Sequence, residues 1–384
     1  MTDRRRNVTL SLAAGLLALA MPAMAQSACP TIEGPKCRVA LPTGIEMAYL
    51  ETGPADGPAV VLVHGLTDSS RSWSTTMEAL HRLDPGLRIL AIDQRGHGAS
   101  SMPPVAQCAA APEACFRMAD FAADLAAFLQ AKGIAKATLA GHSLGSFVVQ
   151  EVALDRPELV ERAVLVATAA RGVDNVALRD FVLKEPVEGS WKTALEAKGK
   201  AYPADFYELT PLDADPNAMD WMARNWVVDP VAPQAFLEPY TPETAAVKLG
   251  TWIGATKALL ATDNRARLAA LAVPTLVIWG TQDSIFLADP DQVETKAALA
   301  AAAKDHGTRS FWKQYGLRPL PASGVQEDDI GHNTQWGAPE QVAADIAAFV
   351  EDGRPLPGLP RSEGPGRIGT VIVDPDRTVI ESWP

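Results

Sequence analysis

The sequence predicts an α/β fold in which a mostly parallel central sheet carries helices on both faces and an inserted helical cap. Three observations lead to this prediction. Short apolar runs of strand length alternate along the chain with segments of helical spacing. A Gly-x-Ser-x-Gly motif at 141–145 joins one apolar run directly to a helical segment. The alternation stops between 171 and 266 and then resumes, which indicates a separate segment inserted into the sheet.

The first 25 residues are predicted to be a secretory signal. Arginines at 4–6 give a positive start, an apolar run follows over 8–20, and Ala23-Met24-Ala25 offers a small-x-small cleavage site. The run is too short to span a membrane, and the residues after the arginines match a twin-arginine signal poorly. We therefore expect a periplasmic or secreted protein without a membrane anchor.

The charge and length limit what the exported chain can be. Removing 1–25 takes away three arginines and one aspartate, so the formal net charge moves from −12 to −14. An acidic chain with no basic cluster argues against nucleic acid and anionic membranes as partners. We divide the rest into a first core part (26–170), a helical cap (171–266), a second core part (267–352), and a linker with a hairpin-like tail (353–384).

The four cysteines form two closely spaced pairs. In an exported chain, local bridges Cys29–Cys37 and Cys108–Cys115 are the simplest of the three connectivities. Free thiols or a metal site are the alternatives. We expect the bridges, with neither metal nor cofactor.

The first core part contains five expected strands. Residues 44–51 alternate polar and apolar side chains, which predicts a half-exposed edge strand. The others are continuous apolar runs of the kind buried on both faces, at 59–63, 87–92, 137–140 and 163–167. Helical spacing follows three of these strands, at 73–83, at 118–129 and from 144 onward.

The cap and the second core part follow. Proline and tryptophan are frequent in the cap, and most of its aromatic residues should fill its own core while a few line an apolar pocket. The expected elements after it are a strand at 273–280, a helix at 291–303, a last strand at 309–315 or 324–329, and a helix from Pro339. Residues 370–373 and 378–381 suggest a hairpin, which is too weak to stand alone and should pack on the body or on a second copy, giving a homodimer.

Ser143 is the candidate nucleophile. A serine on a sharp strand-to-helix turn is presented clear of its own backbone, and flanking glycines relieve the crowding of such a turn. The helix that starts there directs free N–H groups and a positive dipole end toward the serine. The backbone N–H groups of Leu144 and of Leu66, in the turn after strand 59–63, should form the oxyanion hole.

A serine nucleophile needs a base within hydrogen-bond reach and an acid that orients the base. Among the six histidines, His332 is the best base, because it lies on a glycine-flanked turn after the last strand and before the final helix. Asp283 is the best acid, since it follows a buried strand at the edge where Ser143 lies, with Asp174 as the alternative. The chain order Ser, Asp, His fits a nucleophile on such an elbow.

Four motifs give the chain its resemblance to the α/β-hydrolase fold superfamily over about residues 40–352. They are His64-Gly65-Leu66, Asp93-x-Arg95-Gly96-His97-Gly98-x-Ser100, Gly141-His142-Ser143-Leu144-Gly145, and the pair Asp283 and Gly331-His332. The pattern is most similar to capped esterases, lactonases, C–C hydrolases and cofactor-free perhydrolases. Haloalkane dehalogenases and epoxide hydrolases resemble the chain elsewhere but need aspartate where it has Ser143.

The resemblance implies a secreted serine hydrolase, carboxylesterase-like (EC 3.1.1), that cleaves esters or lactones of small to medium apolar molecules through an acyl-enzyme. A cofactor-free perhydrolase or C–C bond hydrolase with the same triad is the alternative. A binding protein that has kept the fold is a third class, which an intact Ser143, Asp283 and His332 disfavour.

Overall fold

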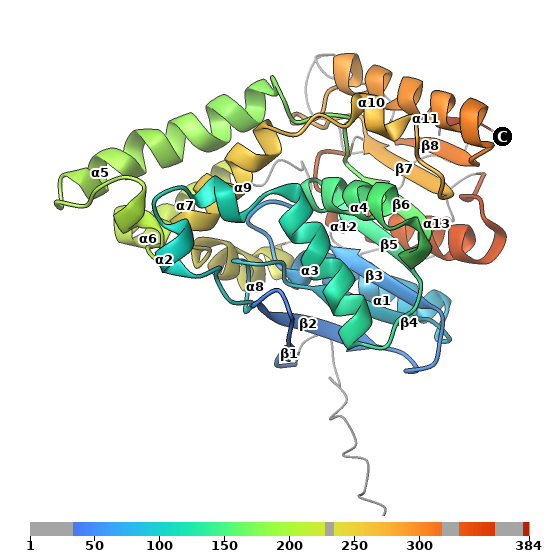
Figure 1. Cartoon of the computed structure of the whole chain (residues 1–384), viewed down its shortest axis with the longest axis horizontal. Coiled ribbons are helices and arrows are strands. Elements are labelled where there is room, and N and C mark those ends of the chain that lie inside the picture. The colour runs from blue at the N-terminus through green and yellow to red at the C-terminus, as the bar shows by residue number, and fades with distance from the viewer. Residues whose placement is uncertain (1–33, 227–233, 317–329, 358–378, 384) are drawn as a thin grey trace, which may run out of the picture.

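A nine-stranded sheet forms the centre of the computed structural model, which describes residues 34–226, 234–316, 330–357 and 379–383 (Figure 1). The strand order is β1-β2-β4-β3-β5-β6-β7-β8-β9. The pairs from β4 to β8 are parallel, and the pairs β1/β2, β2/β4 and β8/β9 are antiparallel. The strands are β1 (Cys37–Ala40), β2 (Glu46–Thr52), β3 (Ala59–Val63), β4 (Arg88–Ile92), β5 (Ala137–His142), β6 (Val160–Val166), β7 (Thr275–Gly280), β8 (Ser310–Tyr315) and β9 (Ile380–Trp383).

The apolar strands are buried on both faces, as their continuous β-branched runs predict. In β3, Val60 to Val63 have no exposed surface, and every residue of β5 and β7 is buried. The prediction of an edge strand at 44–51 is wrong, because β1 covers β2 on its outer side and the middle of β2 is buried. Strand β1 was not predicted, since four residues give too short a pattern to recognise.

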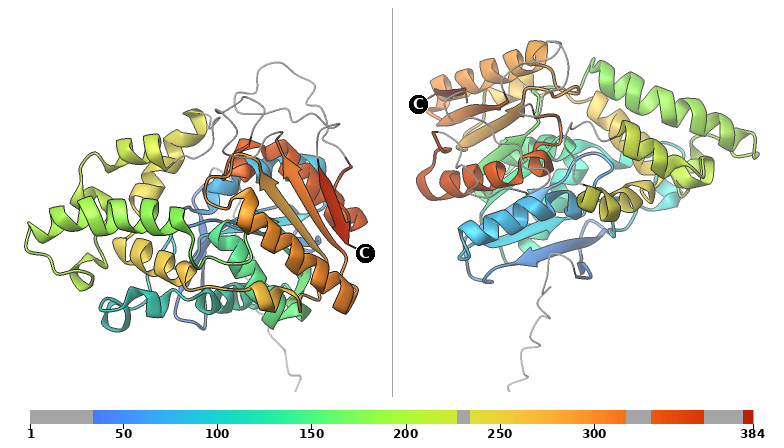
Figure 2. Two further views of the ribbon diagram at one scale, coloured as in Figure 1. Left: turned by 90° about the horizontal axis from the view of Figure 1, so that it is seen from above. Right: turned by 180° about the vertical axis from the view of Figure 1, so that it is seen from behind.

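Helices cover both faces of the sheet, which confirms the predicted fold class. Seen from behind in Figure 2, α1 (Ser74–Leu83) and α13 (Pro339–Asp352) lie together on one face, where they share a core with Val60, Leu62 and Ile278. The other face carries α3 (Met118–Ala131), α4 (Leu144–Asp155), α10 (Arg265–Leu268) and α11 (Val293–His306) (Figure 1).

The segment between β6 and β7 is helical and projects to one side of the sheet (Figure 1). Trp191 and Trp252 are buried there, with ring centroids 5.2 Å apart, so they fill the core of this segment. Trp226 contacts Trp252 at 4.9 Å but also lines the cavity described below. Its helices are η4 (Ala177–Trp191), α5 (Lys192–Glu196), η5 (Ala204–Phe206), α6 (Pro211–Ala214), α7 (Ala218–Asn225), α8 (Gln234–Ala245) and α9 (Leu249–Leu260).

The bridge Cys108–Cys115 is present and links α2 (Val105–Cys108) to η2 (Pro112–Cys115). This excursion packs against the cap: Gly254 of α9 lies so close to Phe116 and Pro112 that a Cβ there would approach both within 3 Å. Cys37 is also disulfide-bonded, and Cys29, its expected partner, lies outside the described residues.

The tail adds an edge strand to the sheet. Strand β9 pairs antiparallel with β8, with Ser310 opposite Trp383 and Lys313 opposite Ile380. The first arm of the expected hairpin, 370–373, lies outside the described residues, as do 324–329 and the expected signal. Of the two candidates for the last core strand, 309–315 contains β8. Within the ranges that the structure describes, no helix combines the length and apolarity needed to cross a membrane.

A buried ion pair joins β8 to α13. The Nζ of Lys313 lies 2.8 Å from the Asp345 carboxylate, and both side chains are 0% exposed. The Tyr315 hydroxyl and the Leu356 N–H also donate to this carboxylate. The pair therefore holds the last helix, and the chain that leaves it, against the sheet.

Replacing Asp345 with alanine should lower the free energy of unfolding by about 3–5 kcal/mol, because the Lys313 charge would stay buried without its partner. Urea denaturation measures this loss. The double variant Lys313→Met, Asp345→Leu should recover most of it, since neither charge remains. A single variant as stable as the unsubstituted protein would contradict the role given to the pair.

Candidate active site

The turn between β5 and α4 holds Ser143 in a strained conformation, with φ 50° and ψ −120°. Two glycines make the turn possible. A Cβ on Gly141 would lie 2.3 Å from the carbonyl oxygen of Gly145, and one on Gly145 would lie 2.4 Å from that of His64. Because strand, turn and helix approach so closely, only glycine fits at both positions. The Gly-x-Ser-x-Gly spacing is thus a steric requirement of this turn.

Ser143, His332 and Asp283 meet at the carboxyl ends of the parallel strands. The Oγ of Ser143 lies 2.9 Å from Nε2 of His332, and the other ring nitrogen, Nδ1, lies 2.9 Å from Oδ1 of Asp283. All three are buried, with exposures of 5%, 7% and 1%. The backbone N–H groups of Ile285 and Phe286 donate to the same Asp283 oxygen and fix its orientation.

Asp174, the alternative acid, lies elsewhere. Its side chain is 82% exposed and forms an ion pair with Arg171 at 3.5 Å. Asp283 and His332 are 49 positions apart, and the chain between them includes α11, which crosses one face of the sheet, and β8, before it returns to the site.

The two residues expected to form the oxyanion hole lie on either side of the serine. Leu144 is the first residue of α4, so its N–H has no partner within the helix. Leu66 follows β3 and lines the cavity in front of Ser143. The turn before Leu66 packs tightly, since a Cβ on Gly65 would lie 2.8 Å from Nδ1 of His142. Leu66 and Leu144 thus both lie at the site, as an oxyanion hole formed by their N–H groups requires.

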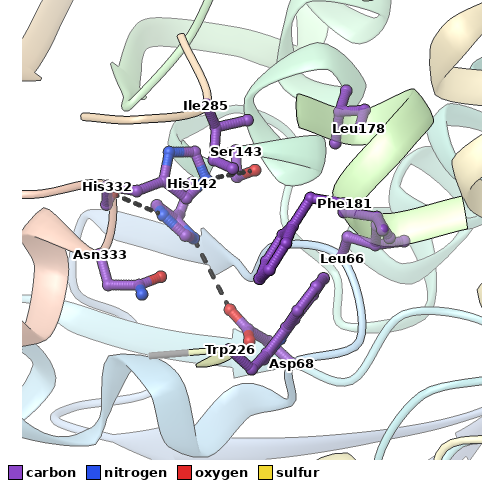
Figure 3. A pocket seen from close by; sticks show the side chains of 11 residues that line it. Leu66, Asp68, His142, Ser143, Leu178, Phe181, Trp226, Ile285, His332 and Asn333 are labelled. Atoms are coloured by element: carbon purple, nitrogen blue, oxygen red, sulfur yellow. Dashed lines mark hydrogen bonds and ion pairs between the residues drawn. The ribbon is translucent and has the colours of Figure 1, made fainter. Parts of the chain in front are cut away.

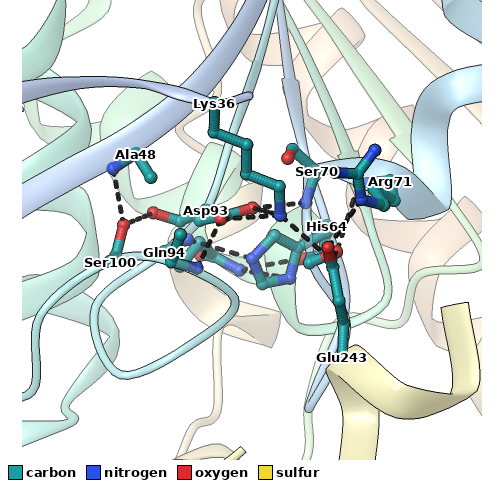
Figure 4. A network of polar contacts seen from close by, with 11 residues as sticks. Lys36, Ala48, His64, Ser70, Arg71, Asp93, Gln94, Ser100 and Glu243 are labelled. Atoms are coloured by element: carbon teal, nitrogen blue, oxygen red, sulfur yellow. Dashed lines mark hydrogen bonds and ion pairs between the residues drawn. The ribbon is translucent and has the colours of Figure 1, made fainter. Parts of the chain in front are cut away.

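A polar network fixes the loop that carries Leu66 and ties it to the cap (Figure 4). The buried Asp93 accepts hydrogen bonds from the N–H groups of Ser70 and Ala99 at 2.7 Å and from Nζ of Lys36. Glu243, on cap helix α8, accepts from Lys36 at 3.0 Å and from Arg71 at 2.6 Å. One end of the cap is thus bound, through charge-assisted hydrogen bonds, to the loop that carries Leu66.

His64, His97 and His142 hold loops, as their motifs suggest. His64 accepts a hydrogen bond from the N–H of Gln94 at 2.9 Å, and its ring lies 4.9 Å from that of His97. Burial lowers the pKa of all three histidines, to about 4 for His97. They therefore remain neutral at pH 7, and it is the ring nitrogen Nε2 of His332 that contacts Ser143.

A cavity of about 40 Å³ opens in front of Ser143 (Figure 3). Its apolar wall consists of Leu66, Leu178, Phe181, Val182, Trp226 and Ile285. Asp68 and Asn333 add polar groups that sequence reasoning missed. In the sequence, only their positions could have pointed to them. Asp68 lies in the same loop as Leu66, and Asn333 directly follows His332.

The sheet, its helices and the strand-end site define an enzyme class, that of the α/β hydrolases. The chain belongs to this family: the family model described as "alpha/beta hydrolase fold" matches residues 58–338.

Among the relatives, "Putative carbamate hydrolase RutD" of Variovorax paradoxus is 34% identical over 239 residues, which are 62% of this chain and 78% of that protein. Bifunctional epoxide hydrolase 2 of Sus scrofa is 30% identical over 174 residues, covering 45% of this chain and only 29% of the relative. A solved structure, the enol-lactonase of Burkholderia xenovorans, has a TM-score of 0.57 at 21% identity over 82% of this chain and all of its own, a likeness of fold.

We expect the protein to lose stability as the pH falls from about 6.5 to about 4. The folded pKa of His97, about 4, lies below its ordinary value of 6.5, so in this window the unfolded chain binds more protons. His97 therefore makes its full contribution to the free energy of unfolding above about pH 6.5. This contribution, on the order of 3 kcal/mol, is lost as the pH falls from about 6.5 to about 4.

Urea unfolding at a series of pH values measures this loss. The control is His97→Asn, which cannot take up a proton. Its stability should depend less steeply on pH, and an equal slope in both proteins would contradict the assignment.

Proposed function

We propose that the protein is a serine hydrolase that cleaves carboxylic esters or lactones of small to medium, largely apolar molecules. The observation that carries this proposal is the unbroken line of hydrogen bonds from Ser143 through His332 to Asp283, with 2.9 Å at each step. A hydroxyl, an imidazole and a carboxylate at such distances form the nucleophile, base and orienting acid of acyl transfer.

In the first half of the reaction, His332 takes the proton of Ser143 while the serine oxygen attacks the ester carbonyl. The negative charge that develops on the carbonyl oxygen is stabilised by the N–H groups of Leu66 and Leu144. His332 then gives its proton to the leaving alcohol, and the acyl group remains on Ser143. In a lactone the leaving oxygen stays attached to the acyl group.

In the second half, His332 removes a proton from water, which attacks the acyl-enzyme and releases the acid. Asp283 keeps the imidazole in the tautomer with a proton on Nδ1 and stabilises the positive charge that forms on the ring. Since two backbone N–H groups already hold its Oδ1, Asp283 stays aligned through both halves.

The cavity supports an apolar substrate of limited size. Six of the eleven residues that line it carry aliphatic side chains or the aromatic rings of Phe181 and Trp226. Its volume, about 40 Å³, is well below that of typical ligand sites. One relative is named as a putative carbamate hydrolase, and a carbamate, like an ester, is cleaved at a carbonyl group. Ser143 stands where the epoxide hydrolases need aspartate, which favours ester over epoxide chemistry.

A cofactor-free perhydrolase or C–C bond hydrolase with the same triad is the second candidate. The non-heme chloroperoxidase of Streptomyces lividans favours the former, with 37% identity over 125 residues, 32% of this chain and 41% of its own. Measuring peracid formation from acetate and peroxide against ester cleavage separates the two activities.

We further propose that the enzyme works outside the cytoplasm. The expected signal at 1–25 supports export, and so does the bridge Cys108–Cys115, since disulfides persist mainly in oxidising compartments.

Substituting alanine for Ser143 should abolish hydrolysis of short p-nitrophenyl esters, because no other group can carry the acyl intermediate. Asp283→Asn should lower kcat/KM by about 10⁴-fold, since the amide would favour the wrong tautomer of His332. Initial rates and circular dichroism of each variant check activity and folding separately.

A fluorophosphonate probe supplies the control. It should label the unsubstituted protein at Ser143 and leave the alanine variant unlabelled. Ester turnover retained by a folded Ser143→Ala variant would refute the proposed function.

A further inference from the structure

A second carboxylate, that of Asp68, lies in the wall of the cavity and takes no part in the proposed proton relay. Asp68 lines the same cavity as Ser143 and is only 3% exposed (Figure 3). Buried carboxylates are costly unless something compensates them, so the side chain calls for a reason.

The partners of Asp68 leave part of its acceptor capacity unused. Its Oδ1 accepts a hydrogen bond from the hydroxyl of Tyr240 on α8. Its Oδ2 is buried and faces Nδ1 of His142 at 3.6 Å, within ion-pair distance but longer than a normal hydrogen bond. The carboxylate in the cavity wall therefore lacks a close partner at this oxygen.

The carboxylate is negatively charged at neutral pH. Burial alone would raise the pKa of Asp68, but the neighbouring imidazoles of His142 and His64 and the Tyr240 hydroxyl outweigh it and lower that pKa below its ordinary value. Neither lysine nor arginine stands among the described residues that line the cavity. Among the described residues that line the cavity, none carries a permanent positive charge to balance that of Asp68.

Aromatic rings complete the surroundings. Phe181 and Trp226 line the cavity with their rings stacked, 6.3 Å apart and 11° from parallel. Ring faces of this kind attract cations and pack against the alkyl groups that surround a charged nitrogen. A carboxylate without a lysine or arginine beside it in the cavity lining, together with an aromatic wall, suits an alkylammonium group.

We propose that Asp68 is a specificity-determining residue that favours substrates carrying a protonated amine at the end that does not react. The ammonium group donates a charge-assisted hydrogen bond to the Asp68 carboxylate, and its alkyl groups pack against Phe181 and Trp226. A carboxylate at the same place on a substrate is repelled. This inference deepens the proposed function and rests on it for turnover. The acidic chain, with a net charge of −12, adds a long-range attraction for cations.

The test uses esters of one shape and three charges. In the first set, butyric acid is esterified with 2-(dimethylamino)ethanol, with the neutral isostere 3-methylbutanol, or with 3-hydroxypropanoic acid. A second set places the same three groups on the acyl side of ethyl esters, so that either half of the substrate can reach Asp68. Acid release at constant pH gives kcat/KM for each ester.

In at least one set, the amine ester should exceed its neutral isostere in kcat/KM by about 10- to 100-fold, the range of a charge-assisted hydrogen bond. The carboxylate ester should be the poorest. Asp68→Asn, which keeps the shape and removes the charge, should reduce the amine preference at least tenfold.

Tyr240→Phe is the matched control. It removes the cap contact of Asp68 but leaves the charge, so it should retain most of the preference. If Asp68 served only to hold the cap, both variants would change the three rates alike. If Asp68→Asn does not fold, the kcat/KM values of the unsubstituted protein for the three esters test the inference. Equal values, or a preference in the reverse order, overturn it.

Calorimetric binding of the intact esters to Ser143→Ala separates this inference from the proposed function. If the protein hydrolyses neutral esters but neither kcat/KM nor binding favours the amine ester, the role of Asp68 is overturned. The hydrolase proposal then still stands. Ser143→Ala should bind the amine ester more tightly than its neutral isostere, and the double variant Ser143→Ala, Asp68→Asn should not. This result supports the role of Asp68 even if no ester is turned over.

Discussion

The hydrogen bonds from Ser143 to His332 and from His332 to Asp283 exist only because separate strand ends meet at one edge of the sheet. Strand β5 delivers the serine, the turn after β7 delivers the aspartate, and the segment after β8 returns the histidine. Parallel strands place their carboxyl ends together, so residues distant in sequence become neighbours without any local contact between them. The strained turn at Ser143 is possible because the strands and helices around it are fully buried and cannot relax.

The cap and the core are joined where the chemistry is expected. Glu243 on α8 binds the loop after β3 through Lys36 and Arg71, and Tyr240 on the same helix reaches Asp68. A displacement of α8 would therefore disturb both the loop that carries Leu66 and the part of the cavity wall that Asp68 forms. Access to the cavity and the geometry of its lining are coupled through this one helix.

The sequence was sufficient for the core of the sheet and for the identity of the three residues that meet at the strand ends, and the reasons are physical. Continuous apolar runs fix buried strands, and the crowding between Gly141 and Gly145 allows few sequences other than the one present. The edges could not be predicted, because β1 and β9 are four residues long and their pairing depends on distant partners. Asp68 was missed for a related reason. Its role in the wall follows from contacts with His142 and Tyr240, which are distant in sequence.

Strand β9 has a consequence for how the molecule meets others of its kind. An outermost strand with unpaired backbone groups is a template for pairing with a second chain, and proteins commonly blunt such edges with short or charged strands. Here β9 occupies the free side of β8, and its Glu381 forms an ion pair with Lys296 of α11. Strand β9 thus becomes the edge of the sheet in place of β8, and its short length and this ion pair blunt that edge. Any dimer made through the tail would have to use a surface other than the margin of β8.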